Sequence, residues 1–217
     1  MTSSEGIKML IATDHQVLKP ILSNTSKMRG TAKSWSLQAI ETCPGSRDSS
    51  GDLVPVCSNC FANKGFYNMP TVKKPRTHNK LAWKEPSFVS DMVEQIGKAK
   101  YFRWYDSGDC YHIALAHKML EIMRLTPNCQ HWFPTRMHKF PKFMAVINKM
   151  QKLHNVVVRF SSDSIEGEII EGATTSTVIQ NGQTISPKIS VCPATIKGNK
   201  PNCKANSCTN CWNKNIP

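Results

Sequence analysis

The sequence has no apolar run that approaches the roughly 18 residues needed to cross a bilayer, which excludes a membrane-spanning class. It also lacks a glycine-rich phosphate loop, a serine in a nucleophile-elbow motif and a cysteine–histidine pair at a catalytic spacing. The opening residues MTSSEGIKMLIATDH have no basic flank followed by an apolar stretch. We therefore expect no signal peptide and a cytoplasmic protein.

Acidic residues are scarce, with 15 Asp and Glu against 28 Lys and Arg, which gives a formal net charge of +13. Basic residues cluster in KKPRTHNK (73–80) and RMHKFPK (136–142). Such clusters can bind the phosphates of nucleic acid or a small anionic ligand, or can simply form a solvated surface. There is no RNA-recognition signature and no helix-turn-helix pattern, so nucleic-acid binding is suggested by charge alone.

Cysteine is abundant, and seven of the nine cysteines fall into two groups near opposite ends of the sequence. The N-terminal group is Cys43, Cys57 and Cys60, and the C-terminal group is Cys192, Cys203, Cys208 and Cys211. Cytoplasmic thiols stay reduced, so clustered cysteines there indicate metal binding rather than disulfides. Thiolates select iron–sulfur clusters, zinc or copper(I).

The spacing favours iron–sulfur clusters, with two of the 4Fe–4S type as the expected pair. Cys203-x4-Cys208-x2-Cys211 matches the C-x4-C-x2-C run of plant-type ferredoxins, and Cys192 would be the fourth ligand. Zinc is the alternative metal, with Cys57-x2-Cys60 and Cys208-x2-Cys211 as two knuckles of one site. That site would need a linker far longer than zinc ribbons use, and it leaves three cysteines unexplained.

Three thiolates leave one corner of a 4Fe–4S cluster without a cysteine. That corner could bind substrate, take a ligand from elsewhere in the chain, or be vacant in a three-iron cluster. Candidates for an internal fourth ligand are Cys110, the best placed of them, and then Cys129, His78 and His112. Alternatively, Cys110 and Cys129 are ordinary thiols packed in the core.

The middle of the sequence alternates between helical and strand patterns. Apolar spacing predicts helices over 86–98, 111–125 and 138–152, and strands over 100–106, 129–135 and 155–160. This βαβαβ order predicts an α/β protein with a parallel sheet. Pro134 predicts that the second strand ends early or lies at an edge. Residues 164–190, with Asn181-Gly182 as a turn signal, are interpreted as a hairpin or excursion.

The chain is short for a complete eight-fold barrel, which takes about 250 residues. We therefore expect one domain over 1–217, an open, partial βα barrel. Its parts are an N-terminal region with a cluster loop (1–65), a βα core (66–163) and a polar excursion with a cysteine-rich tail (164–217).

Charged residues follow or interrupt the three predicted strands. Because ligands of parallel α/β folds bind at the carboxyl edge of the sheet, these residues are predicted to line a cavity there: Arg103, Asp106, Asp109, Arg159 and Asp163. The alternative is structural, with Arg103 paired to Asp106 or Asp163, and Arg159 to another Asp, because an unpaired buried charge is costly.

A resemblance to known families rests on five parts of the sequence: TCPG…VCSNCFANKG, FRWYDSGDCY, HWFPTR, VVVRFSSDS and the cysteine-rich tail. The chain resembles the phage gene product 88 family and, more distantly, the radical SAM enzymes. The resemblance implies a viral protein of the host cytoplasm, with a small TIM-barrel-like fold, iron–sulfur clusters and redox activity. It makes S-adenosylmethionine a candidate cofactor and an electron donor or acceptor protein a candidate partner.

The N-terminal cysteine loop departs from the radical SAM pattern. Radical SAM enzymes use a compact C-x3-C-x2-C loop, whereas thirteen residues separate Cys43 from Cys57 here, and no Gly-Gly-Glu-Pro run is present. The enzymatic interpretation is therefore a radical-SAM-like or other iron–sulfur oxidoreductase. The alternative is a zinc- or cluster-stabilised nucleic-acid-binding protein, with phosphate contacts from Lys73, Lys74, Arg76, Arg136 and Lys139.

Overall fold

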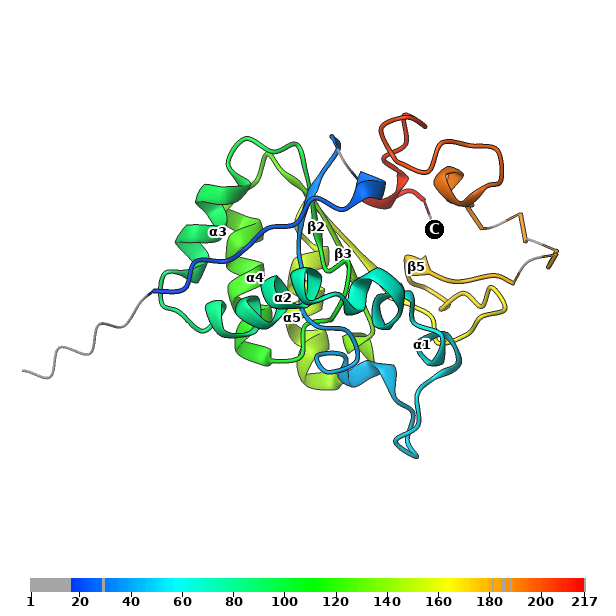
Figure 1. The fold of residues 1–217 in the computed structure, drawn as a ribbon, viewed down its shortest axis with the longest axis horizontal. Helices are drawn as coiled ribbons and strands as arrows, with labels where there is room; N and C mark the ends of the chain where they lie inside the picture. The colour runs from blue at the N-terminus through cyan, green and yellow to red at the C-terminus, as the bar shows by residue number, and fades with distance from the viewer. Residues whose placement is uncertain (1–16, 29, 181, 185, 188, 217) are drawn as a thin grey trace, which may run out of the picture.

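The computed structural model describes residues 17–28, 30–180, 182–184, 186–187 and 189–216 (Figure 1). The opening segment, on which the signal-peptide expectation rests, lies outside these residues. One parallel sheet runs through the protein in the order β1-β2-β3-β4-β5 and does not close on itself. Its strands are β1 (Lys33–Trp35), β2 (Tyr101–Trp104), β3 (Gln130–Thr135), β4 (Val156–Ser161) and β5 (Thr175–Ser176).

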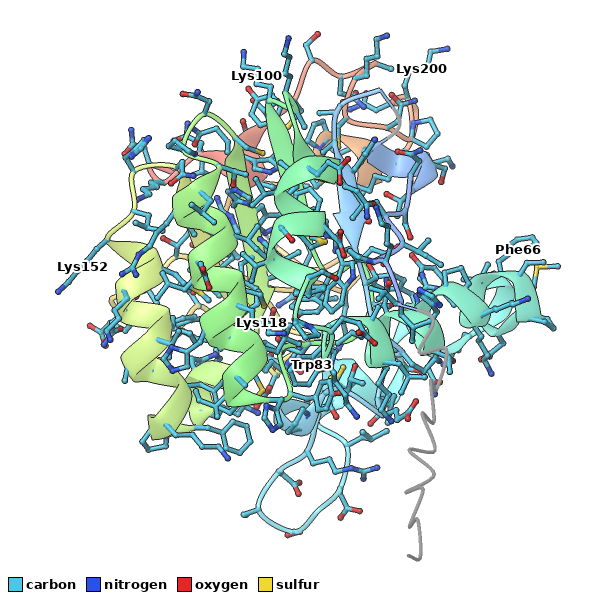
Figure 2. The ribbon with its side chains drawn as sticks, turned by 90° about the vertical axis from the view of Figure 1, so that its left-hand side faces the viewer. Phe66, Trp83, Lys100, Lys118, Lys152 and Lys200 are labelled. Atoms are coloured by element: carbon cyan, nitrogen blue, oxygen red, sulfur yellow. The ribbon has the colours of Figure 1, made fainter. Side chains whose placement is uncertain are left out.

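The helices are α1 (Pro55–Ser58), α2 (Pro70–Ala82), α3 (Phe88–Ile96), α4 (Ile113–Leu125) and α5 (Pro141–Gln151). Helices α3, α4 and α5 lie side by side on one face of the sheet, and the C-terminal tail lies on the other (Figures 1 and 2). Pro141 occupies the first turn of α5, where its missing N–H costs nothing. In the part of the chain that the structure describes, no helix is both long and apolar enough to cross a membrane.

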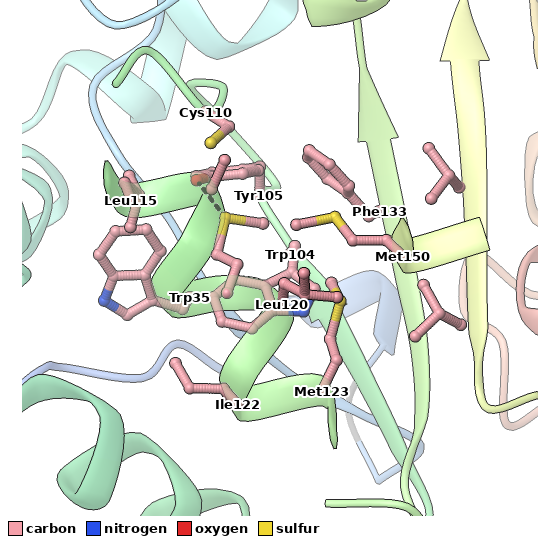
Figure 3. Close-up of a cluster of buried hydrophobic side chains, with 14 of the residues drawn as sticks. Trp35, Trp104, Tyr105, Cys110, Leu115, Leu120, Ile122, Met123, Phe133 and Met150 are labelled. Atoms are coloured by element: carbon pink, nitrogen blue, oxygen red, sulfur yellow. Dashed lines mark hydrogen bonds between the residues drawn. The ribbon is translucent and has the colours of Figure 1, made fainter. Parts of the chain in front are cut away.

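The main core fills the space between the sheet and these helices (Figure 3). Trp35, Trp104 and Phe133 from the strands meet Leu115 and Leu120 of α4. In β2, Phe102 and Trp104 are buried against the helices, while Tyr101 and Arg103 are half-buried on the opposite face. This alternation follows from the two-residue period of a strand.

A smaller apolar cluster attaches the C-terminal tail to the opposite face of the sheet. Trp212 is only 5% exposed, and its indole N–H donates to the carbonyl of Phe102 over 2.9 Å. The ring centre of Trp212 lies 5.2 Å from that of Tyr101 and 5.4 Å from that of Trp132. The tail is therefore fixed to the middle of the sheet.

The predicted alternation of helices and strands over 86–160 is confirmed, with boundaries that differ by a few residues. The sequence patterns did not reveal β1 or α2. A closed barrel is absent, and the coarser prediction of an open α/β fold with a parallel sheet is the one that the structure confirms.

The prediction that Pro134 ends β3 or marks an edge strand is wrong. β3 lies between β2 and β4, and Pro134 is the register partner of Arg159. Pairing of β3 with β2 stops at Trp132, two residues earlier. Pro134 thus lies beyond the part of β3 that β2 contacts, where the absence of a backbone donor is tolerated.

For 164–190 the sequence predicted a hairpin or an excursion, and the described residues of this segment contain no antiparallel strand pair. This segment contributes β5, whose Thr175 and Ser176 pair in parallel with Phe160 and Ser161 of β4. Asn181, half of the expected turn signal, lies outside the described residues. The remainder is the irregular excursion that the polar composition predicted.

Candidate cysteine-lined metal sites

The three N-terminal cysteines line one cavity of about 400 Å³ at the carboxyl end of the sheet. We call it the N-terminal cysteine cavity. The ends of β2, β3 and β4 and the segments that follow them supply several polar residues: Asp106, Ser107, Asp109, Arg136, Ser161 and Ser162. Two groups far apart in sequence, the cysteine loop and the strand ends, therefore meet here.

The cysteine loop is held against the end of β2 by backbone hydrogen bonds. The amide of Leu37 donates to Ser107 over 3.1 Å, and the amide of Asp109 donates to Thr42 over 3.0 Å. Gly108 permits this approach, because its φ is +78° and a Cβ there would lie 2.7 Å from Leu37 Cβ. Cys43 directly follows Thr42 and is thereby placed beside the strand end.

Gly45 brings the same loop against the end of β3. A Cβ at Gly45 would lie 2.6 Å from Arg136 Cβ and 2.8 Å from the Arg136 carbonyl oxygen. On the β4 side, the amide of Val56 in α1 donates to the Asp163 carbonyl over 3.1 Å and so fixes the adjacent Cys57. The amide of Cys60 donates to the Cys57 carbonyl over 3.1 Å.

Asp109 ties two strand ends together beneath the cavity. Its carboxylate accepts hydrogen bonds from the Thr135 hydroxyl (2.8 Å), the Arg136 amide (2.8 Å) and the Cys110 amide (2.7 Å). Burial nevertheless raises the pKa of Asp109, because desolvation outweighs these hydrogen bonds. Asp109 thus organises the floor of the cavity.

Asp106 combines one paired and one unpaired oxygen. Arg76 of α2 lies 3.4 Å from Oδ2 of Asp106 and donates from Nε to the Ser107 hydroxyl over 2.5 Å. Oδ1 of Asp106 is buried and has no hydrogen-bond partner among the described residues. A buried carboxylate oxygen without a donor is costly, and here it belongs to a residue that lines the cavity.

Asp163 holds two basic side chains beside the cavity. Arg136 Nε lies 3.2 Å from Asp163 Oδ1, and Lys139 pairs with Oδ2 of the same carboxylate. Arg136 also donates to the Ser162 carbonyl over 2.7 Å. The charge of Arg136 acts to lower the pKa of Cys57, and so favours a thiolate there.

Burial favours the protonated thiol at two of the cysteines of this cavity, Cys43 and Cys57. Burial raises the pKa of Cys43 to about 12, with further increases from Asp109 and from the neighbouring Cys57 and Cys60. Burial likewise raises the pKa of Cys57, although Arg136 opposes it. A metal would displace these protons, so metal uptake depends on pH.

Two strained residues line the same cavity. Ile40 and Tyr105 have φ values of +66° and +61°. Residues other than glycine rarely adopt this backbone conformation, which costs about 1–3 kcal/mol each. Ile40 directly precedes the cysteine loop, and Tyr105 follows β2. Backbone strain gathers where the cavity is built.

The four C-terminal cysteines line a much smaller space of about 30 Å³, which we call the C-terminal cysteine pocket. The amide of Cys203 donates to the Lys27 carbonyl over 2.8 Å, and that of Cys208 donates to the Cys203 carbonyl over 3.0 Å. Burial raises the pKa of Cys211 to about 11. A third cavity of about 400 Å³ adjoins this pocket and shares Cys192, Cys208 and Cys211 with it.

The donor sets suit thiophilic metal centres, but they are not arranged as finished sites. Within the described residues, no group of three or more His, Cys, Asp or Glu side chains converges as a metal ion would require. The cysteines are free thiols that share a cavity or a pocket. Metal binding would draw the sulfur atoms together, since most such sites form only with the metal.

The two zinc knuckles suggested by the sequence are not brought together. Cys57 and Cys60 line the N-terminal cysteine cavity, whereas Cys208 and Cys211 line the C-terminal cysteine pocket.

None of the four suggested fourth ligands lines the N-terminal cysteine cavity. Cys110 is 1% exposed and lies in the main core near Tyr105 (Figure 3), and Cys129 is 2% exposed. His112 caps α4 by accepting from the Ala114 amide, and His78 contacts the Lys19 carbonyl. The reading of Cys110 and Cys129 as packed thiols agrees with these positions.

The cavity residues suggested by the strand ends divide between sites. Arg103, Asp106 and Asp109 line the N-terminal cysteine cavity. Asp163 does not line this cavity but pairs with Arg136, which does. Arg159 lines the third cavity instead. Among the described residues Arg103 has no ion pair, and Asp106 pairs with Arg76, so the expected Arg103–Asp106 and Arg103–Asp163 pairs are wrong.

The basic residues suggested for phosphate contacts are also divided. Lys73 and Lys74 of α2 are exposed, whereas Arg76 is buried and paired with Asp106. Arg136 and Lys139 are engaged with Asp163. Two lysines remain free to contact an extended anion.

Trp132 and Tyr105 are lining residues that the sequence reasoning missed. Trp132 was read only as an apolar strand residue, yet strand alternation places it on the face opposite the main core. The available signal was the two-residue period of a strand, which puts Trp132 on the same face as Pro134, another lining residue of the cavity.

Comparison with known sequences gives one match. The family model described as Gene product 88 matches residues 11–214. No curated protein and no solved structure matches the chain.

Proposed function

Given that the chain belongs to the Gene product 88 family, whose match includes both cysteine groups, we propose that it is a phage-type iron–sulfur protein with two 4Fe–4S clusters. In this proposal the five-stranded sheet is an open, partial βα barrel of radical-SAM-like type. The protein works as an oxidoreductase in the host cytoplasm.

One observation carries the proposal: the two cysteine groups line spaces of very different size. Three cysteines line a cavity of about 400 Å³ together with Arg103 and Asp106, and four cysteines enclose about 30 Å³. Four thiolates complete the ligand set of a 4Fe–4S cluster, whereas three leave one iron without a cysteine. The N-terminal cluster is then the working site and the C-terminal cluster is closed.

The residues of the N-terminal cysteine cavity suit a small ligand beside the open iron. Arg103 offers a positive group and Asp106 an unpaired oxygen, so the cavity can accept a ligand with both an anionic and a cationic group. S-adenosylmethionine is one such molecule. The bound cluster would supply one-electron chemistry, and the chain supplies orientation and charge.

Anaerobic purification with metal analysis tests the proposal. About eight irons with matching sulfide per chain, and visible absorption, are expected. Cys57→Ala and Cys208→Ala should each remove about half of the iron, while Cys129→Ala, a buried thiol outside both sites, should keep all of it. A colourless protein with stoichiometric zinc would overturn the proposal.

Titration with S-adenosylmethionine tests the candidate ligand. Binding at the open iron should change the paramagnetic spectrum of the reduced N-terminal cluster. Asp106→Asn should weaken this change, and Cys208→Ala should leave it in place. An unchanged spectrum at saturating ligand would exclude S-adenosylmethionine.

Nucleic-acid binding remains the second candidate because α2 exposes Lys73 and Lys74, and the nearby Phe66 is 80% exposed at the edge of the molecule (Figure 2). Basic side chains with exposed aromatic rings can hold single strands. Lys73→Glu with Lys74→Glu should then abolish salt-sensitive binding to a single-stranded oligonucleotide, while Lys149→Glu on α5 with Lys152→Glu just after it should not. Wild-type protein that binds no oligonucleotide at low salt would remove this candidate.

A further inference from the structure

Two residues separate the N-terminal cysteine cavity from the C-terminal cysteine pocket. Arg103 of β2 and Trp132 of β3 are register partners, and both project from the face of the sheet away from the main core. They are the only described residues that line both spaces. The guanidinium carbon of Arg103 lies 4.3 Å from the centre of the Trp132 ring.

No carboxylate of the described residues lies within salt-bridge distance of Arg103, and Asp106, whose charge raises the pKa of Arg103, is already paired with Arg76. Its Nε donates to the Tyr105 carbonyl over 2.9 Å, and its guanidinium stacks on Trp132. Leaving a half-buried cation without an anion is costly unless an anion is supplied from elsewhere. Thiolate-bound clusters on either side of Arg103 would supply that negative charge.

The aromatic packing continues from this wall into the C-terminal cysteines. Trp132 contacts Trp212 with ring centres 5.4 Å apart, and Trp212 directly follows Cys211. Arg103 lines the C-terminal cysteine pocket together with Cys203 and Cys211. Arg103 is therefore within electrostatic reach of the C-terminal site as well as at the wall of the N-terminal one.

We propose that Arg103 and Trp132 form a shared wall that couples the two clusters, so that an electron passes between them and one positive charge sets both reduction potentials. The inference rests on the proposed function. A one-electron donor protein or dithionite reduces the C-terminal cluster by one electron. With both clusters bound, that electron would pass to the oxidised N-terminal cluster and the C-terminal cluster would return to its oxidised state, with no bond or proton moved.

The alternative role for these residues is packing alone, in which Arg103 and Trp132 merely support the tail. Packing would not connect the electronic properties of the two clusters. A fixed positive charge favours the reduced, more negative form of any cluster close to it. The two midpoint potentials therefore distinguish a coupling wall from a structural one.

The test is a redox titration of the anaerobic holoprotein, followed by electron paramagnetic resonance with iron content measured in parallel. Arg103→Gln should make both midpoint potentials more negative. Arg136→Gln, beside Cys57, should move only the N-terminal potential, and Lys27→Gln, beside Cys203, only the C-terminal one. Arg103→Gln that moves one potential or neither would overturn the inference.

A second measurement uses the wild-type protein and covers the case in which the Arg103→Gln variant does not bind its iron–sulfur clusters. When both clusters of the wild-type protein are reduced, their paramagnetic signals should broaden or split relative to the singly reduced protein. Unperturbed, additive signals would overturn the shared wall. A wild-type protein without iron would overturn the proposed function along with the inference, and the iron measurement identifies that result.

Discussion

Arg159 lies in β4 at 5% exposure, and its guanidinium donates to the carbonyls of Asn210, Asn213 and Ile216 over 3.0–3.1 Å. The sequence left two roles open for Arg159, a cavity position or a structural pair with an aspartate. The carbonyls belong to a tail with only short 3-10 turns, in which the Asn210 and Asn213 carbonyls each accept one backbone amide, so they have lone pairs left for the cation. Periodicity along the strand located Arg159 correctly but could not reveal a partner 50 residues away.

Replacing Arg159 tests its role in holding the tail. Arg159→Met should lower the free energy of unfolding by about 3 kcal/mol, because several tail carbonyls lose a charged donor. The tail should also become sensitive to protease. Urea unfolding measures the first effect, and Arg124→Met at an exposed position of α4 should change the stability by less than about 0.5 kcal/mol.

His131 makes stability depend on pH. It is fully buried in β3, its Nδ1 accepts from Trp104 Nε1 over 3.2 Å, and its Nε2 lies 2.8 Å from the Thr126 hydroxyl. Because the Thr126 hydroxyl donates to Ile122, the neutral tautomer with a proton on Nε2 fits this network. Burial lowers the pKa of His131 to about 4.

The lowered pKa means that the unfolded chain binds a proton between pH 6.5 and about pH 4 while the folded chain does not. The stabilising contribution is therefore complete above pH 6.5 and is lost as the pH falls toward 4. It amounts to about 3 kcal/mol. Unfolding of His131→Gln, which keeps a donor, should lack this part of the pH dependence, and identical slopes for variant and wild type would contradict the assignment.

Helix α2 could not be predicted from apolar periodicity. Its buried positions are Arg76, Asn79 and Ala82, which recur every three residues but are mostly polar. A pattern search that follows apolar residues therefore finds nothing, although Asn79 and Arg76 of the helix donate to Ser36 and Ser107, which lie just after β1 and β2. By contrast, α4 and α5 bury apolar side chains at helical spacing, and the alternating strands between them were predictable for the same reason.

The position of the cavity at the strand ends was also predictable, because the carboxyl ends of parallel strands lie at the same edge of the sheet. Which cysteine group would meet that edge was not, because no periodic signal connects a loop to a distant strand. The decisive contacts are backbone hydrogen bonds and the close approach of Gly45 and Gly108. Such contacts depend on loop conformation, which the residue types leave open.

Gly45→Ala should disturb the N-terminal cysteine cavity selectively. The added methyl group would lie 2.6 Å from Arg136 Cβ, so the loop carrying Cys43 must move away. Iron at the N-terminal site should fall by more than half while the C-terminal cluster is retained, as resolved by their separate paramagnetic signals. Ser49→Ala, an exposed change in the same loop, should keep full iron, and normal loading of Gly45→Ala would show that the close approach is dispensable.

On the scale of the whole molecule, the two faces of the sheet differ in how they are stabilised. Helices α3, α4 and α5 bury a large apolar core on one face. The other face is covered by the cysteine segments, whose main apolar contact is Trp212. Apolar area is small there, so hydrogen bonds to the backbone contribute more of the stabilisation, and under the proposed function metal ligation would add to it.

Metal removal should therefore separate the two faces. After chelation of an iron-loaded protein, the segment 189–216 should be cleaved by protease, whereas 86–161 should remain protected. Trp212→Ala should produce the same cleavage even with iron present, because loss of a buried tryptophan costs about 3–5 kcal/mol. Equal protection of both segments after chelation would contradict this division, as mass spectrometry of the fragments can establish.

The hydrogen bond from Trp212 to Phe102 joins residues that are 110 positions apart. Because synthesis runs from the N-terminus, Phe102 is made well before its partner Trp212. The strands that carry Arg103 and Trp132 leave the ribosome before the tail that covers them. At about 5–20 residues per second, roughly 3–10 seconds pass between completion of β4 and synthesis of Trp212. During that interval the nascent chain exposes an aromatic and cationic sheet surface, so under the proposed function the timing of iron delivery relative to synthesis of the tail would affect how this face forms.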